Sequence, residues 1–425
     1  MAENEVVVRG IQWSSVLSVG HVTRAFRIAI WPPSKLFLCL LALAITIGAG
    51  MLLDLGFKTE VNYQSFAAHM KGVFTLATGQ CPAPAWLPLP GTWYGPVVAV
   101  EQMVYLIKDY WQTHFWFALI NTVVALLVWT FFGGAVCRMA AVQFARDERV
   151  GLGQALKFVC KRYASLVASP LAMFVVIALI ALPVFFIAGT VLLIPYVGEI
   201  VVAVLFFLAL GLGVVLSLLA LFGISGLGLQ MPAIGAEGRD AFDAISRSVG
   251  YVFNRPWKYL LYSLFSLLYM CLTFVLVRFF AFLVLKIPYI FLKATWLGSR
   301  TDGLPDKLAQ VWVEPTMDNL FTMPDSGGAL HFAAVVIGVF IFILLGMMIA
   351  FIPSFLLSSQ TVIYFLLRRM VDFKDFDEVY LEEEQQKESG LARLEKTEST
   401  QVEPEPPAAE DDAKAPADGE AADGT

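Results

Sequence analysis

Six stretches of the chain are apolar, nearly free of charge, and long enough to cross a bilayer. They cover residues 36–53, 115–137, 171–194, 200–231, 259–285 and 332–367. Five of them contain no charged residue, and the fifth in order contains only Arg278. A helix needs about 20 apolar residues to cross the hydrocarbon core. The pattern therefore predicts an all-α polytopic membrane protein with six transmembrane helices.

A different pattern precedes the fifth stretch, in residues 240–259. Apolar residues fall there at positions i, i+3, i+7, i+10 and i+11, which is the spacing of one face of a helix. They are Phe242, Ile245, Val249, Val252 and Phe253. Pro256 should stop this helix, and the apolar stretch begins at Tyr259. The pattern indicates an amphipathic helix that lies in the bilayer interface.

The same spacing recurs in residues 154–170 and 19–33. A proline follows at i+14 and a basic residue stands at i+5 in all three segments. The prolines are Pro33, Pro170 and Pro256, and the basic residues are Arg24, Lys161 and Arg247. Two apolar stretches follow each segment. This arrangement suggests three repeats, each an interfacial amphipathic helix followed by a helical hairpin.

Lysine and arginine cluster at one end of the predicted spans. They occur in residues 9–35, 138–162, 239–258 and 368–369, which all lie on the same side of six spans. Because basic loops stay on the cytoplasmic side, both termini should be cytoplasmic. The first apolar stretch lacks a cleavage pattern and should be a retained span. We expect a multi-pass protein of the bacterial cytoplasmic (inner) membrane.

These patterns divide the chain into three parts. Residues 1–34 form a cytoplasmic N-terminus with an interfacial helix, residues 35–370 a six-helix membrane domain, and residues 371–425 an acidic cytoplasmic tail. Two connections, residues 54–114 and 286–331, should be external loops.

Composition agrees with this division. The chain is 58% apolar and 15% charged, whereas soluble domains carry roughly 25% charged residues. The net charge is −6, but residues 381–425 hold fourteen acidic and four basic residues, so the rest of the chain is positive. The tail should be disordered beyond about residue 397, since low hydrophobicity and like charge prevent a packed core. It is either a solubilising tail or a docking segment for a protein partner.

The segment AFDAISRSVGYVFNRPWKY, residues 241–259, resembles a segment of bacterial, planctomycete-type multipass membrane proteins without an assigned activity. It is loosely similar to the membrane domain attached to some glycerophosphodiester phosphodiesterases. The resemblance implies a membrane-embedded helical domain. The phosphodiesterase barrel is absent from this sequence, so no catalytic residue carries over.

The sequence contains no recognisable catalytic motif. Its five cysteines and four histidines are scattered, which indicates neither a disulfide framework nor a metal site. A glycine-rich phosphate loop, a nucleophile elbow and a zinc-protease motif are all missing. We therefore expect no enzyme, no cofactor, no metal and no nucleic-acid partner. Energised transport is disfavoured because no predicted span carries an acidic residue in its middle.

Arg278 has two possible roles. About 30 Å of helix separates it from Lys258, which places it near the outer surface. There its side chain could extend to the lipid headgroups. Alternatively, it could pair with Glu199, which stands in the tight turn between the third and fourth spans.

The leading functional hypothesis is a non-enzymatic membrane scaffold or assembly protein that binds membrane lipids of the inner leaflet. Five residues are expected to contact lipid headgroups, at about 1 kcal/mol each near an anionic surface. They are Arg24, Lys161, Arg162, Arg247 and Arg255. The alternative is a permease or lipid-handling transporter with a cavity between the hairpins. A polar cavity reaching mid-membrane would favour the transporter.

Overall fold

The computed structural model confirms an all-α protein with six helices that are long and apolar enough to span a membrane. The structure describes residues 18–57, 108, 111–112, 114–296, 307–317, 319–322, 324 and 327–380. These ranges contain no strand. Nearly all of them belong to one compact unit that ends at Val379. Most of the predicted loop 54–114 and the tail beyond residue 380 lie outside the described residues.

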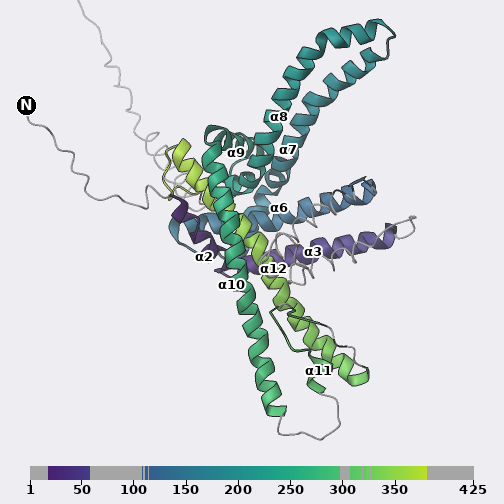
Figure 1. Cartoon of the computed structure of the whole chain (residues 1–425). Coiled ribbons are helices and arrows are strands. Elements are labelled where there is room, and N and C mark those ends of the chain that lie inside the picture. The colour runs from purple at the N-terminus through teal and green to yellow at the C-terminus, as the bar shows by residue number, and fades with distance from the viewer. Residues whose placement is uncertain are drawn as a thin grey trace, which may run out of the picture. The chain divides into compact units, whose positions relative to one another are not determined.

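The six long helices form three hairpins (Figure 1). The first pairs α3 (Ser34–Phe57) with α6 (Phe115–Arg146), the second pairs α7 (Leu152–Leu192) with α8 (Val197–Glu237), and the third pairs α10 (Pro256–Trp296) with α12 (Gly328–Val371). The last four helices have 41 to 44 residues, about twice what a perpendicular span requires. Each of them therefore continues well past one membrane crossing.

The protein core lies where the second helices of the three hairpins meet. Helices α6, α8 and α12 contact one another, and their burial is concentrated in residues 133–146, 226–237 and 350–371. We call these three stretches, together with α2 (Arg24–Ile30) and α9 (Ala241–Asn254), the hub. Small residues permit the approach: a Cβ on Gly235 would lie 3.2 Å from the backbone nitrogen of Arg138.

The three amphipathic segments pack against these second helices in a cyclic order. Each lies on the second helix of the preceding hairpin, and the first lies on that of the last hairpin. Helix α2 lies on α12, α7 lies on α6, and α9 lies on α8. One contact illustrates each pair: Ser354 Oγ donates to the Ala29 carbonyl, Tyr163 Oη donates to the Leu127 carbonyl, and Gly226 faces the backbone of Ser248. Each segment thus contacts the second helix of a different hairpin from the one that it precedes.

The prolines after the three amphipathic segments occupy different positions relative to the helices. Helix α3 begins directly after Pro33, and α10 begins at Pro256, in the first-turn position that tolerates proline. By contrast, α7 runs without interruption through Pro170. Pro170 has no N–H to donate to the Leu166 carbonyl four residues back, and the Ser169 hydroxyl donates to that carbonyl instead, at 3.4 Å. The second amphipathic segment is therefore part of a long helix.

Two connections outside the hub differ in regularity. Helices α7 and α8 are joined by residues 193–196, where Tyr196 has φ 62°. Residues 286–296, expected in an external loop, continue α10 as helix. Part of that loop forms α11 (Lys307–Val311), which packs against α12.

Candidate functional site

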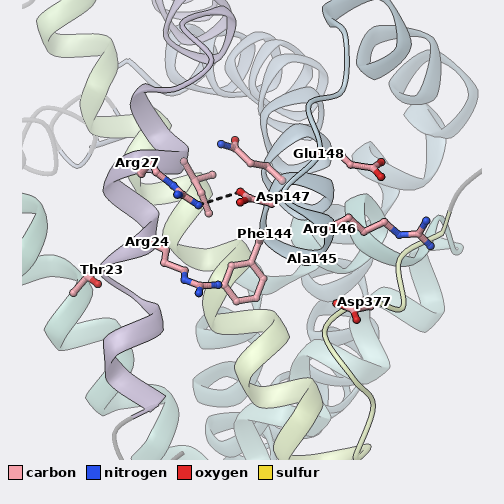
Figure 2. Close-up of a pocket in the computed structure, with 11 residues that line it drawn as sticks. Thr23, Arg24, Arg27, Phe144, Ala145, Arg146, Asp147, Glu148 and Asp377 are labelled. Atoms are coloured by element: carbon pink, nitrogen blue, oxygen red, sulfur yellow. Dashed lines mark hydrogen bonds and ion pairs between the residues drawn. The ribbon is translucent and has the colours of Figure 1, made fainter. Parts of the chain in front are cut away.

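A charged cavity of about 890 Å³ lies in the hub between α2 and the end of α6. Three arginines and three acidic residues line it: Arg24, Arg27, Arg146, Asp147, Glu148 and Asp377. Figure 2 shows their side chains around Phe144. We call this cavity the charged hollow.

The hollow owes its shape to the way α6 ends. Asp147 follows the last turn with φ 55°, and its backbone N–H donates to the Gln143 carbonyl. Aspartate is one of the few residues with a side chain that tolerate this left-handed conformation. The turn places its carboxylate 3.0 Å from the Arg27 guanidinium of α2 (Figure 2). Both side chains are exposed, so this pair contributes at most about 1 kcal/mol.

Directly behind the wall of the hollow lies the buried amine of Lys35. Its Nζ donates to the Ile28 carbonyl at 2.7 Å and to Gln143 Oε1 at 2.6 Å. The side chain is 0% exposed, and no carboxylate of the described chain forms an ion pair with it. The sequence signalled Lys35 only as one of several cations near the first span.

A second charged cluster joins α8, α9 and α12. The Glu237 carboxylate lies 3.3 Å from the Arg368 guanidinium and 3.2 Å from that of Arg247. It also accepts a hydrogen bond from the Tyr364 hydroxyl at 2.9 Å. The side chains of Glu237 and Arg368 are 7% and 3% exposed. This buried pair is therefore screened little by solvent.

Arg247 is held by three carboxylates. Besides Glu237, it contacts Asp243 at 3.0 Å and Asp372 at 3.2 Å. Burial lowers the pKa of Arg247, but Glu237 and Asp243 outweigh burial and raise the pKa above its ordinary value. Tyr251 donates to Asp372 at 2.5 Å, and burial together with this carboxylate raises the pKa of Tyr251. We call Glu237, Asp243, Arg247, Arg368 and Asp372 the carboxylate network.

The five residues expected at lipid headgroups fall into two groups. Arg24, Lys161 and Arg255 are exposed. Arg162 is half-buried and pairs with Asp240 at 3.3 Å. Arg247 is committed to the carboxylate network, which leaves its guanidinium little capacity for a phosphate. The sequence could not reveal this, because two of its three partners lie outside its own helix.

Arg278 is buried, whereas the sequence placed its side chain near the outer surface. The residue is 0% exposed, and its Nη2 donates to the Met317 carbonyl at 2.6 Å. Met317 belongs to the connection between α10 and α12, which covers this part of α10. Glu199 is exposed in the first turn of α8, and no hydrogen bond or ion pair joins these two described residues. The structure therefore does not bring the proposed partners together.

Within the described residues, no three His, Cys, Asp or Glu side chains gather closely enough to hold a metal ion. Comparison of the chain with known protein families, with characterised proteins and with solved structures finds no match. The resemblance to bacterial multipass proteins and to phosphodiesterase membrane domains stays a prediction.

Proposed function

We propose that this protein is a non-enzymatic scaffold or assembly protein of the bacterial cytoplasmic membrane that holds the inner leaflet with its hub. Both termini would then be cytoplasmic, and the acidic tail would be available to a protein partner. The observation that carries the proposal is the packing of α9.

Helix α9 presents apolar side chains on two sides. Ala244, Tyr251 and Val252 are buried, in a helix that packs against α8. Phe242 and Phe253 are 79% and 64% exposed, and the Phe253 ring also contacts Phe222 of α8, with the ring centroids 5.1 Å apart. Exposed aromatic side chains on a helix beside a membrane span are typical of a segment that inserts into the headgroup region.

The start of α10 extends this exposed surface. Trp257 is 80% exposed and stands beside the exposed cation of Arg255. Tryptophan concentrates at membrane–water interfaces, and each cation near an anionic surface contributes about 1 kcal/mol. Arg24, Lys161 and Arg255 are exposed, so these three cations would be the ones to reach lipid phosphates.

The cyclic packing around the hub supports a further part of the proposal, namely three repeats of one unit. Superposing residues 19–137 on residues 156–231 and 242–367 tests it. The three hairpins should overlay in the same order and hand. A different order or hand would mean that the shared spacing reflects composition alone.

The depth of α9 in the bilayer tests the proposed lipid contact. A nitroxide placed at Phe253 in full-length protein in proteoliposomes should collide more often with oxygen than with a water-soluble nickel chelate. Asn254, the next residue, is exposed on the polar side of α9 and serves as the matched position. It should show the opposite preference. Equal access of the nickel chelate to both positions would refute the interfacial placement.

A further inference from the structure

The segment that follows α12 is attached to the hub along its whole length. We call residues 372–379 the strap. Directly after α12 the chain turns at Phe373, whose φ is 54°. A bulky side chain is uncommon in this left-handed conformation, which persists only where the surrounding contacts hold it. The strap has such contacts on both sides of Phe373.

Before the turn, Asp372 anchors the strap to α9. Its carboxylate accepts hydrogen bonds from the Arg247 guanidinium at 3.2 Å and from the Tyr251 hydroxyl at 2.5 Å. Residues four positions apart lie on the same face of a helix. One carboxylate therefore restrains the face that α9 turns toward the end of α12.

After the turn, the strap is attached to elements other than α9. The Phe376 ring packs against the rings of His21 and Phe144, with ring centroids 5.7 and 5.4 Å away. The Arg369 guanidinium lies over the same ring, 4.7 Å from its centroid. Val379, at the end of the strap, is buried. These contacts fix the strap to α6, to α12 and to the residues before α2.

Helix α9 has a second attachment that does not depend on the strap. Arg247 also pairs with Glu237 of α8 at 3.2 Å, and α9 packs along α8. Detachment of the strap would remove the two hydrogen bonds to Asp372 and leave α9 seated on α8. Helix α9 would therefore become more mobile without leaving the hub.

We propose that the strap is a releasable latch on α9. Detachment of Phe376 from the hub withdraws Asp372 from α9, and α9 becomes mobile in the membrane interface. The turn at Phe373 favours release, because the chain can leave its left-handed conformation once the contacts beside it are lost. The strap leads directly into the acidic tail, so a protein bound to the tail would act on the latch. This inference rests on the proposed function, which assigns α9 to the interface and the tail to a partner.

The mobility of a nitroxide at position 253, in full-length protein in proteoliposomes, tests the latch. Phe376→Ala removes the ring that attaches the strap to α6. The mobile fraction of the label on α9 should then rise about fivefold, the lower end of typical couplings between two sites. The matched control is Phe373→Ala, which should keep the wild-type mobility because the Phe373 ring is 87% exposed. An unchanged mobile fraction in Phe376→Ala, or an equal rise in both variants, would overturn the proposal.

A second variant shows whether Phe376 acts on α9 through Asp372. Asp372→Ala removes the anchoring carboxylate and should raise the mobility of the label as much as Phe376→Ala does. Because both variants break one link, the double variant should show no further rise. A label at Lys157, an exposed residue of α7, should not respond to either variant. Additive rises at position 253, or a rise at position 157, would indicate general loosening and refute the latch.

The latch and the interfacial placement of α9 give separate readings. Placement is measured by the preference of the label at position 253 for oxygen over the nickel chelate, and the latch by the mobility of that label. A label that prefers the chelate but responds to Phe376→Ala would refute the placement alone. A label that prefers oxygen but ignores Phe376→Ala would refute the latch alone.

Discussion

Helix α8 passes through two regions of opposite packing. In residues 197–221 every side chain is exposed or half-exposed apart from the position of Gly198, although most of these residues are large and apolar. In residues 226–237, which belong to the hub, the buried positions are mainly small or polar, as with Gly235 and Gln230. Together with residues 174–192 of α7 and the turn, we call the first region the distal hairpin.

The difference shows what holds a helical membrane protein together. Lipid tails are as apolar as leucine, so large apolar side chains of the distal hairpin gain little by leaving lipid for protein. Helices associate where small residues let backbones approach and where polar groups find partners. The hub has both, namely Gly235 against the α6 backbone and the carboxylate network. Stability should therefore depend strongly on hub residues and weakly on the distal hairpin.

Removing the charge of Glu237 should cause the largest effect. Glu237→Gln removes the buried carboxylate that faces the Arg368 guanidinium, which then keeps only the exposed carboxylate of Glu378 at 3.4 Å. Breaking a buried ion pair typically costs about 3–5 kcal/mol. Unfolding of the purified protein in detergent measures the loss. The control is Glu199→Gln, in the exposed first turn of the same helix, which should change stability by at most about 0.5 kcal/mol. Equal effects of the two variants would break the distinction between the two regions.

The sequence predicted the helices better than it predicted their ends. Charge-free stretches identify six spans because the bilayer imposes a minimum length on them. The prediction of a separate amphipathic helix bounded by Pro170 was wrong, because α7 runs through this proline and the Ser169 hydroxyl donates to the carbonyl that Pro170 leaves without an N–H. The apolar pattern of the sequence does not predict this hydrogen bond.

The candidate site was much less predictable. Lys35 and Gln143 are 108 positions apart, and Glu237 and Tyr364 are 127 apart. Counting basic residues gives the side of the membrane on which they lie but does not give their partners. The sequence therefore marked Arg24 and Arg247 as equivalent. In the structure, carboxylates from the end of α8, from α9 and from the residue after α12 surround Arg247, whereas Arg24 is exposed.

A glycine-to-alanine pair in α8 sharpens the comparison. Gly235→Ala places a Cβ 3.2–3.3 Å from the α6 backbone, which cannot move as a flexible side chain could. Overpacking of this kind costs about 1–3 kcal/mol. A Cβ on Gly211, in the distal hairpin, meets nothing within 4 Å, and Gly211→Ala should be neutral or stabilise the helix by up to about 1 kcal/mol. The free energy of unfolding, measured for both variants under one condition, should fall for Gly235→Ala and stay level or rise for Gly211→Ala. Destabilisation by both would contradict the lipid exposure of residue 211.

The smallest predicted effect concerns pH and also belongs to the hub side of the comparison. The distal hairpin contains only Tyr196 and Glu199 as titratable side chains. Next to the hub, His21 packs against the rings of Phe144 and Phe376. Burial, followed by the charges of Arg24 and Arg369, lowers the pKa of His21 below its ordinary value of 6.5.

The sign of the pH effect follows from proton binding. As pH falls through 6.5, the unfolded chain protonates His21 before the folded protein does, so stability decreases until the lower folded pKa is passed. His21→Phe keeps an aromatic ring but removes the proton, so the loss of stability between pH 7 and pH 5 should become smaller. Because His21 is only partly buried, the change should stay below about 1 kcal/mol. Above pH 7 the two proteins should show the same slope of stability against pH, and an unchanged slope below it would exclude His21 as the source.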